Sequence, residues 1–190
     1  MKCKPTPLTF TFSILLLASL ACTIFVGGPE YPDQTIPASE GEVTAMKTQI
    51  EQALLQGVGT GVVTLQFTEN QLTSYFTLKL QSLTNPPFTD PQVLLRDGQM
   101  QIYGRVSSGV FTANMFLAMD VSIDQETGLP VLSISTADFG PIPAPEGLNA
   151  AISAIIDEAF TGSFGPVATG IRIETISIEG GIMTLIGRIK

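Results

Sequence analysis

The strongest structural signal in the chain is VFTANMFLAMDVSID, residues 110–124. Its odd-numbered positions from Phe111 to Ile123 are all apolar, and most of the even-numbered positions are polar. A period of two residues is typical of a β-strand with one buried face. At about 3.3 Å per residue such a strand would be roughly 45 Å long, so we expect it to twist and curl. Its apolar face needs an elongated partner, which a long amphipathic helix would provide.

Three segments have the three- and four-residue apolar spacing of amphipathic helices. The capping-box spacing at Ser39 to Glu42 precedes the first segment, and Gly57 marks its end. Thr68 can cap the second, and Pro145 lies near the start of the third, where proline is tolerated. The third has the widest apolar face, and we expect it to lie in the curled sheet. The predicted helices are residues 43–57, 69–80 and 146–160.

The strands are predicted to form an antiparallel meander. Asp97-Gly98 is a strong hairpin signal, and Gly180-Gly181 indicates a second hairpin. The apolar phase slips after Ile173, which predicts a bulge near Thr175. We therefore predict an α+β fold, in which a long curved antiparallel sheet is wrapped around a long amphipathic helix, with an additional N-terminal helix. The predicted strands are residues 62–67, 92–95, 99–106, 110–124, 131–136, 171–178 and 182–189.

The N-terminus has the features of a secretory signal. Lys2 and Lys4 precede a mostly apolar run from Leu8 to Leu20, which is too short for an ordinary transmembrane helix. Removal of residues 1–21 as a signal peptide would leave seven basic and 17 acidic residues, a formal net charge of −10. So acidic a chain is a poor partner for nucleic acid and is repelled by anionic lipid headgroups.

Cys22 follows Ser-Leu-Ala and resembles the lipid-anchor cysteine of bacterial lipoproteins, although Ser19 stands where that processing site usually has leucine. The alternatives are a plain signal peptide cut nearby and an uncleaved anchor extended to Val26. All three interpretations place the domain outside the cytoplasm. On the first, the protein is a membrane-anchored lipoprotein of the cell envelope, with residues 22–38 as a glycine- and proline-containing tether and residues 39–190 as one domain.

The chain lacks the side chains that most enzymes use. It has no histidine or tryptophan, and its two cysteines, Cys3 and Cys22, both lie near the N-terminus. The usual general base, the thiol nucleophile and the common zinc ligands are therefore absent from the predicted domain. Asp120, Asp124 and Glu126 do not have the spacing of a calcium loop and fit a solvated turn better. We expect no enzymatic activity, no metal and no cofactor.

Four stretches together resemble a known family: FTENQLTSYF, LRDGQMQIYGRV, GPIPAP and ISIEGGIMTLIGRI. They are similar to the YpmS-like and LmeA-like bacterial envelope proteins, small relatives of the tubular lipid-binding (BPI-like, TULIP) domains, over about residues 40–190. The resemblance implies a curved sheet around a long helix, with an apolar groove that holds lipid chains in the better-known relatives. It supplies no ligand-contacting residue for a numbered position in this chain.

Two functions are consistent with this pattern. The first is an envelope lipoprotein that binds a lipid or another apolar small molecule between sheet and helix and is held at the membrane by its N-terminal lipid. The second is a structural or protein-interaction lipoprotein with a filled core, whose protein partner the sequence does not name. Adaptable methionines favour the first slightly. The candidate groove or core residues are Met46, Ile50, Leu54, Phe111, Met115, Leu117, Met119, Leu148, Ile152, Ile155 and Ile156.

Overall fold

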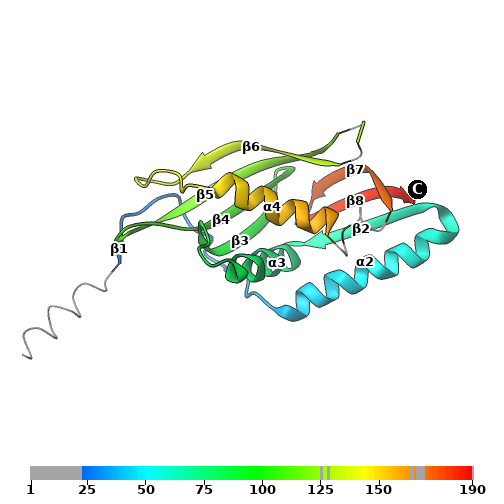
Figure 1. Ribbon diagram of the computed structural model, residues 1–190, viewed down its shortest axis with the longest axis horizontal. Helices are drawn as coiled ribbons and strands as arrows, with labels where there is room; N and C mark the ends of the chain where they lie inside the picture. Colours follow the sequence, from blue (N-terminus) through cyan, green and yellow to red (C-terminus); the bar gives the residue numbers. More distant parts are fainter. Residues whose placement is uncertain (1–22, 125, 128, 163–164, 166–169, 190) are drawn as a thin grey trace, which may run out of the picture.

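The computed structural model describes residues 23–124, 126–127, 129–162, 165 and 170–189. The predicted signal peptide and the anchor residue Cys22 lie outside these described residues. The described part has an α+β fold with three helices and a curled, mostly antiparallel arrangement of strands (Figure 1). The predicted fold class is therefore confirmed at this level.

The larger sheet is built around β5 (Phe111–Ile123), which confirms the predicted long strand to within one residue at each end. On one side β5 pairs with β4 (Gln99–Ser108), and β4 pairs with β3 (Thr89–Arg96). On its other side β5 pairs with β6 (Pro130–Asp138) and, in parallel, with the short β1 (Ile24–Phe25). The alternating burial from Ala113 to Leu117 gives the sheet one face toward the core.

The smaller sheet has the order β2-β8-β7, with β2 at Val62–Thr68, β7 at Ile171–Glu179 and β8 at Ile182–Ile189. The β7–β8 register shifts between Ile173 and Thr175, which confirms the predicted bulge. Because β7 also lies beside β5 and β3, the two sheets surround a common core.

Both predicted hairpin turns are confirmed. Asp97 and Gly98 have φ values of 54° and 76°, and Gly180 and Gly181 have φ values of 59° and 78°. A two-residue turn with both central residues at positive φ matches the right-handed twist of the strands that it joins.

The first helix, α2 (Glu40–Thr60), has 21 residues and begins at Ser39, whose side chain accepts a hydrogen bond from the Gly41 N–H. The prediction that it ends at Gly57 is wrong, since Gly61 in the left-handed conformation closes the helix. Gly57 instead allows close packing, because a Cβ at this position would lie 2.4 Å from a methyl carbon of Val63.

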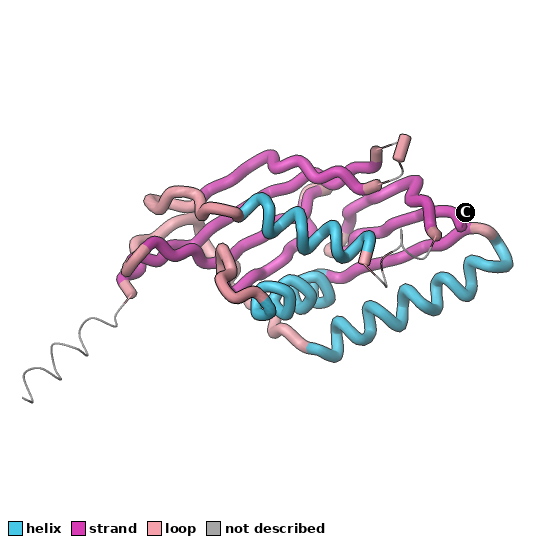
Figure 2. Tube along the Cα trace, viewed as in Figure 1, coloured by secondary structure: helices cyan, strands magenta, loops and turns pink. Residues whose placement is uncertain are grey.

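The other two helices contact the sheets in different ways. α3 (Glu69–Ser82) begins with the predicted Thr68 cap, and the Gln71 side chain completes a capping box. The Thr73 hydroxyl accepts a hydrogen bond from the Val93 N–H at 2.9 Å and so covers the free edge of β3. α4 (Leu148–Thr161) has 14 residues and lies over the strands of the larger sheet, while α2 lies beside β2 and α3 (Figure 2).

The N-terminal segment, residues 23–38, is hydrogen-bonded to the domain at several points. The Val26 N–H donates to the Thr112 carbonyl at 2.8 Å, and the Ile36 N–H donates to the Gln92 side chain at 2.6 Å. Composition predicts a tether here, because glycine and proline give the segment no period. In the structure the segment lies against the domain, since backbone pairing to β5 needs no side-chain pattern.

Candidate functional site

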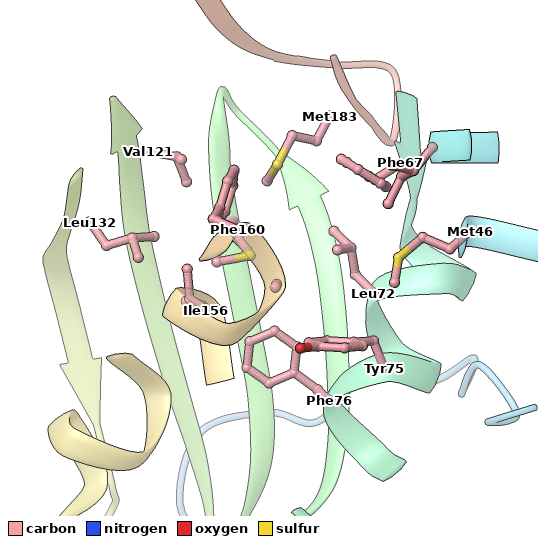
Figure 3. Close-up of a pocket in the computed structure, with 13 residues that line it drawn as sticks. Met46, Phe67, Leu72, Tyr75, Phe76, Val121, Leu132, Ile156, Phe160 and Met183 are labelled. Atoms are coloured by element: carbon pink, nitrogen blue, oxygen red, sulfur yellow. The ribbon is translucent and has the colours of Figure 1, made fainter. Parts of the chain in front are cut away.

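An apolar cavity lies at the centre of the molecule, where the three helices meet both sheets (Figure 3). Its volume is about 60 Å³. The walls come from every layer of the fold, and three of the side chains are methionines. The lining residues are Met46, Ile50, Phe67, Leu72, Tyr75, Phe76, Met100, Val121, Leu132, Ile156, Ala159, Phe160 and Met183. We call this space the inner cavity.

Tyr75 brings a hydroxyl group to the inner cavity. This hydroxyl lies 3.4 Å from the Ile155 carbonyl of α4 and donates a weak hydrogen bond to it. Burial, together with the negative charge of Glu158, raises the pKa of Tyr75 to about 12. The hydroxyl therefore stays neutral at physiological pH, and the inner cavity is lined by uncharged groups.

The inner cavity adjoins a wider pocket of about 390 Å³ between α2, α3 and the C-terminal end of α4. Met46, Ile50, Tyr75 and Ala159 line both spaces, so these four side chains form the boundary between them. Lys47, Lys79 and Glu158 lie at the rim of this outer pocket, where Lys79 forms an exposed ion pair with Glu158. The inner cavity is therefore apolar, and the pocket beside it carries charged side chains.

A further pocket of about 590 Å³ lies at the other end of α4, between its first turn and strands β5 and β6. Leu117 and Leu148 contribute to its walls. Between this pocket and the inner cavity, Ile152 and Ile155 are buried in the core. The sheet-facing side of α4 is therefore packed in its middle and hollow near both ends.

The predicted site residues fall into five groups. Phe111 is 45% exposed, so its assignment to the groove or core is wrong, because this end of β5 extends past the packed body of the domain. Leu54 is half-buried at the edge of α2. Met115, Met119, Ile152 and Ile155 are packed in the core; Met46, Ile50 and Ile156 line the inner cavity; and Leu117 and Leu148 line the pocket at the start of α4.

Sequence reasoning did not single out Tyr75, Phe160, Val121 or Leu132 as site residues. Each lies at an apolar position of a helix or strand, so the periodicity does carry a signal for its burial. The signal is incomplete because a period identifies the buried face and not the positions on that face that border a void.

Asp120 near the end of β5 and Asp124 just after it have structural partners. The Thr127 and Glu126 N–H groups donate to Asp124 and lower the pKa of its carboxyl group, while Asp120 accepts a hydrogen bond from Gln99 at 2.9 Å. Within the described ranges, no three Asp, Glu, Cys or His residues are placed to hold a metal ion. These carboxylates stabilise a turn and a strand pair.

No protein-family model and no curated protein sequence matches the chain. Among the described residues, no helix has the length and hydrophobicity needed to cross a membrane.

Proposed function

We propose that this protein is a bacterial envelope protein, attached to the membrane through its N-terminus, that binds a lipid or similar apolar molecule between its helices and its curled sheet. The observation that carries this proposal is that the apolar inner cavity lies directly beside the outer pocket, separated from it by Met46, Ile50, Tyr75 and Ala159. A ligand with an apolar chain and a polar head would place the chain inside and the head at the charged rim. The resemblance to tubular lipid-binding domains points to the same ligand class.

The size of the inner cavity indicates how a ligand would enter. A volume of about 60 Å³ is well below the roughly 300–1,000 Å³ of typical ligand pockets, so a chain enters only if the walls move apart, and α4 is the element that we expect to move outward. The polar contacts that hold α4 in place are weak, which favours such a movement. They include the 3.4 Å hydrogen bond to Tyr75 and the exposed ion pair to Lys79, and Gly147 gives its N-terminus no side-chain cap.

The small volume also favours a second candidate, a structural or interaction protein with a filled core. On this view the inner cavity is a packing defect, and the outer pocket is a surface hollow. The two functions differ in what the protein carries when it is purified and in how it responds when the cavity is filled.

The test is mass spectrometry of organic extracts from the full chain, purified from the membranes of its own host. We expect a bound lipid above the background of a control protein. Ala159→Phe should reduce the lipid load while the domain stays folded, because residue 159 lines both spaces. The matched control is Ala151→Phe on the same helix, a position outside the lining of either space. An empty wild-type protein, together with a loss of stability in Ala159→Phe, would support the filled core instead.

A further inference from the structure

Four large apolar side chains are exposed together at one end of the molecule. Ile24 and Phe25 of β1 are 52% and 58% exposed, and Val110 and Phe111 at the start of β5 are 50% and 45% exposed. Ile24 pairs with Phe111 in the sheet and donates its N–H to the Val110 carbonyl at 2.7 Å. Ile24 and Phe111 lie on one face of this sheet end and Phe25 on the other, so the four residues surround the end of the sheet, which we call the apolar tip. It lies at one end of the long axis, and the α2–β2 turn lies at the other (Figure 1).

The apolar tip has no charged side chain in either of the segments that form it. Residues 23–29 and 106–113 contain no Asp, Glu, Lys or Arg, although the whole chain has a net charge of −8. The acidic remainder of the surface is repelled by anionic headgroups. The tip therefore combines exposed apolar area with the absence of charge, which are the properties needed to enter a membrane interface.

The tip is also held firmly to the domain. The Val26 N–H donates to the Thr112 carbonyl, the Asn114 N–H donates to the Gly27 carbonyl at 2.9 Å, and the Asn114 side chain donates to the Pro29 carbonyl at 3.1 Å. Gly28 lies so close to β5 that a Cβ there would be 2.5 Å from the Asn114 carbonyl oxygen. The first described residues are thus a fixed part of the sheet.

The chain leaves little distance between this tip and the proposed membrane attachment. Only Thr23 separates Cys22 from Ile24. If the apolar run ending at Leu20 stayed as an anchor, the four steps to Ile24 would span at most about 14 Å. With either attachment the tip must lie at the bilayer surface.

We propose that the apolar tip inserts into the interface of the lipid bilayer and fixes the domain with its long axis pointing away from the membrane. The two phenylalanines contact the acyl-chain boundary, and the α2–β2 turn is the most distant point. This inference rests on the membrane attachment in the proposed function, but it does not depend on a ligand in the inner cavity.

The absence of tryptophan from the chain allows a direct test. Phe25→Trp and Phe111→Trp each introduce a single fluorescent reporter into the full chain, reconstituted in vesicles of phosphatidylethanolamine and phosphatidylglycerol. Some of the lipids carry bromine on the acyl chain near the headgroup. The matched control is Val58→Trp, at a side chain that is 76% exposed near the far end of α2. Thermal unfolding shows whether each variant is folded.

We expect the emission of both tip reporters to shift to the blue and to lose most of its intensity with brominated lipid, while the Val58→Trp emission stays unchanged. Vesicle binding without quenching at the tip would overturn the proposed orientation and leave the membrane attachment intact. No binding to vesicles would overturn both. Equal quenching at all three positions would overturn a unique orientation, and self-association in solution that buries the tip reporters would assign this surface to a second copy of the chain.

Discussion

Tyr75 brings a hydroxyl group to the inner cavity, and the ionisation of this group affects the stability of the fold. Its pKa of about 12 in the folded protein lies above the ordinary value of about 10 that applies in the unfolded chain. A raised folded-state pKa contributes stability that is complete below about pH 10 and is lost as the pH rises toward about 12. Ionisation of this hydroxyl therefore opposes folding above about pH 10.

We predict that Tyr75→Phe flattens the alkaline part of the stability profile. Phenylalanine has no proton to release, so the free energy of unfolding should fall less between about pH 10 and about pH 12 than in the wild type. Below this range the variant should lose at most about 1 kcal/mol, because the hydrogen bond to Ile155 is long. Urea unfolding at a series of pH values measures both effects.

Tyr103→Phe is the comparison for this prediction. Burial raises the pKa of Tyr103, but the charge of Arg96 opposes the shift. Removal of the Tyr103 hydroxyl should therefore change the pH dependence of the free energy of unfolding less than removal of the Tyr75 hydroxyl. If the free energy of unfolding of Tyr75→Phe fell with pH as steeply as that of the wild type, the Tyr75 hydroxyl would not be shielded from water as it is in the structure.

Gly57 shows why a residue type can indicate the wrong role. A glycine at the end of an apolar helical pattern usually predicts a helix stop. Here the same absence of a side chain lets α2 pack closely against Val63, and the stop falls at Gly61. The two uses of glycine look identical in the sequence, because only the partner strand distinguishes them.

At the scale of elements, α4 shows how far sequence reasoning reaches. The apolar spacing identifies Ile152, Ile155 and Ile156 as one buried face, and the structure buries all three. Only the structure separates Ile156, which borders the inner cavity, from its neighbours. The distinction depends on side chains from β6, β8 and α3, which are remote in sequence from α4.

We predict that Ile155→Ala destabilises the protein by about 2–5 kcal/mol, as expected for a packed isoleucine. Ile156→Ala should cost less, because part of its side chain already faces a void and has fewer contacts to lose. Equilibrium denaturation of the two variants under the same conditions measures the difference. Equal losses would mean that α4 is packed on the cavity side as tightly as elsewhere, and would favour the filled core.

For the strands too, the local sequence pattern predicts some features and not others. Asp97-Gly98 and Gly180-Gly181 predict their hairpins correctly, because only a few residues tolerate the positive φ that such turns require. The pairing of β1 with β5 was not predicted. Two residues are too few to show a period. Their backbone hydrogen bonds to β5 require no particular side chains, so the sequence does not indicate them. An apolar space between sheet and helix was predicted as a class of site, but the position of the outer pocket between α2, α3 and the end of α4 was not.

At the scale of the whole molecule, the apolar tip and the outer pocket are separate features, and the proposed insertion of the tip in the membrane relates one to the other. Phe111, which the alternating pattern assigns to the groove or core, is exposed beside Ile24 instead. The alternating pattern identifies the core-facing side of β5 correctly, but it cannot show that the start of the strand extends beyond the packed core. If the tip is in the bilayer, the fold fixes the direction in which the outer pocket faces relative to the membrane.

This fixed geometry depends on the close contact between Gly28 and β5, which leads to a prediction for Gly28→Ala. Alanine at this position would place its Cβ 2.5 Å from the Asn114 carbonyl oxygen, at a φ of 115° that side chains rarely adopt. The segment from Ile24 to Gly28 should therefore separate from β5, because its hydrogen bonds to Thr112 and Asn114 cannot form. Hydrogen exchange should become faster at the Val26 and Asn114 amides, while the core strands keep their protection.

The consequence for orientation follows from the same change. With its N-terminal segment released, the domain should stay on the membrane but lose its fixed direction, so quenching of the Phe111→Trp reporter should fall in the double variant. Gly27→Ala is the matched control, since its φ of 97° imposes backbone strain but a Cβ there meets no atom within 4 Å. Rapid exchange at Val26 combined with unchanged quenching at position 111 would show that the tip binds the bilayer without this segment, and that the sheet edge does not set the orientation of the domain.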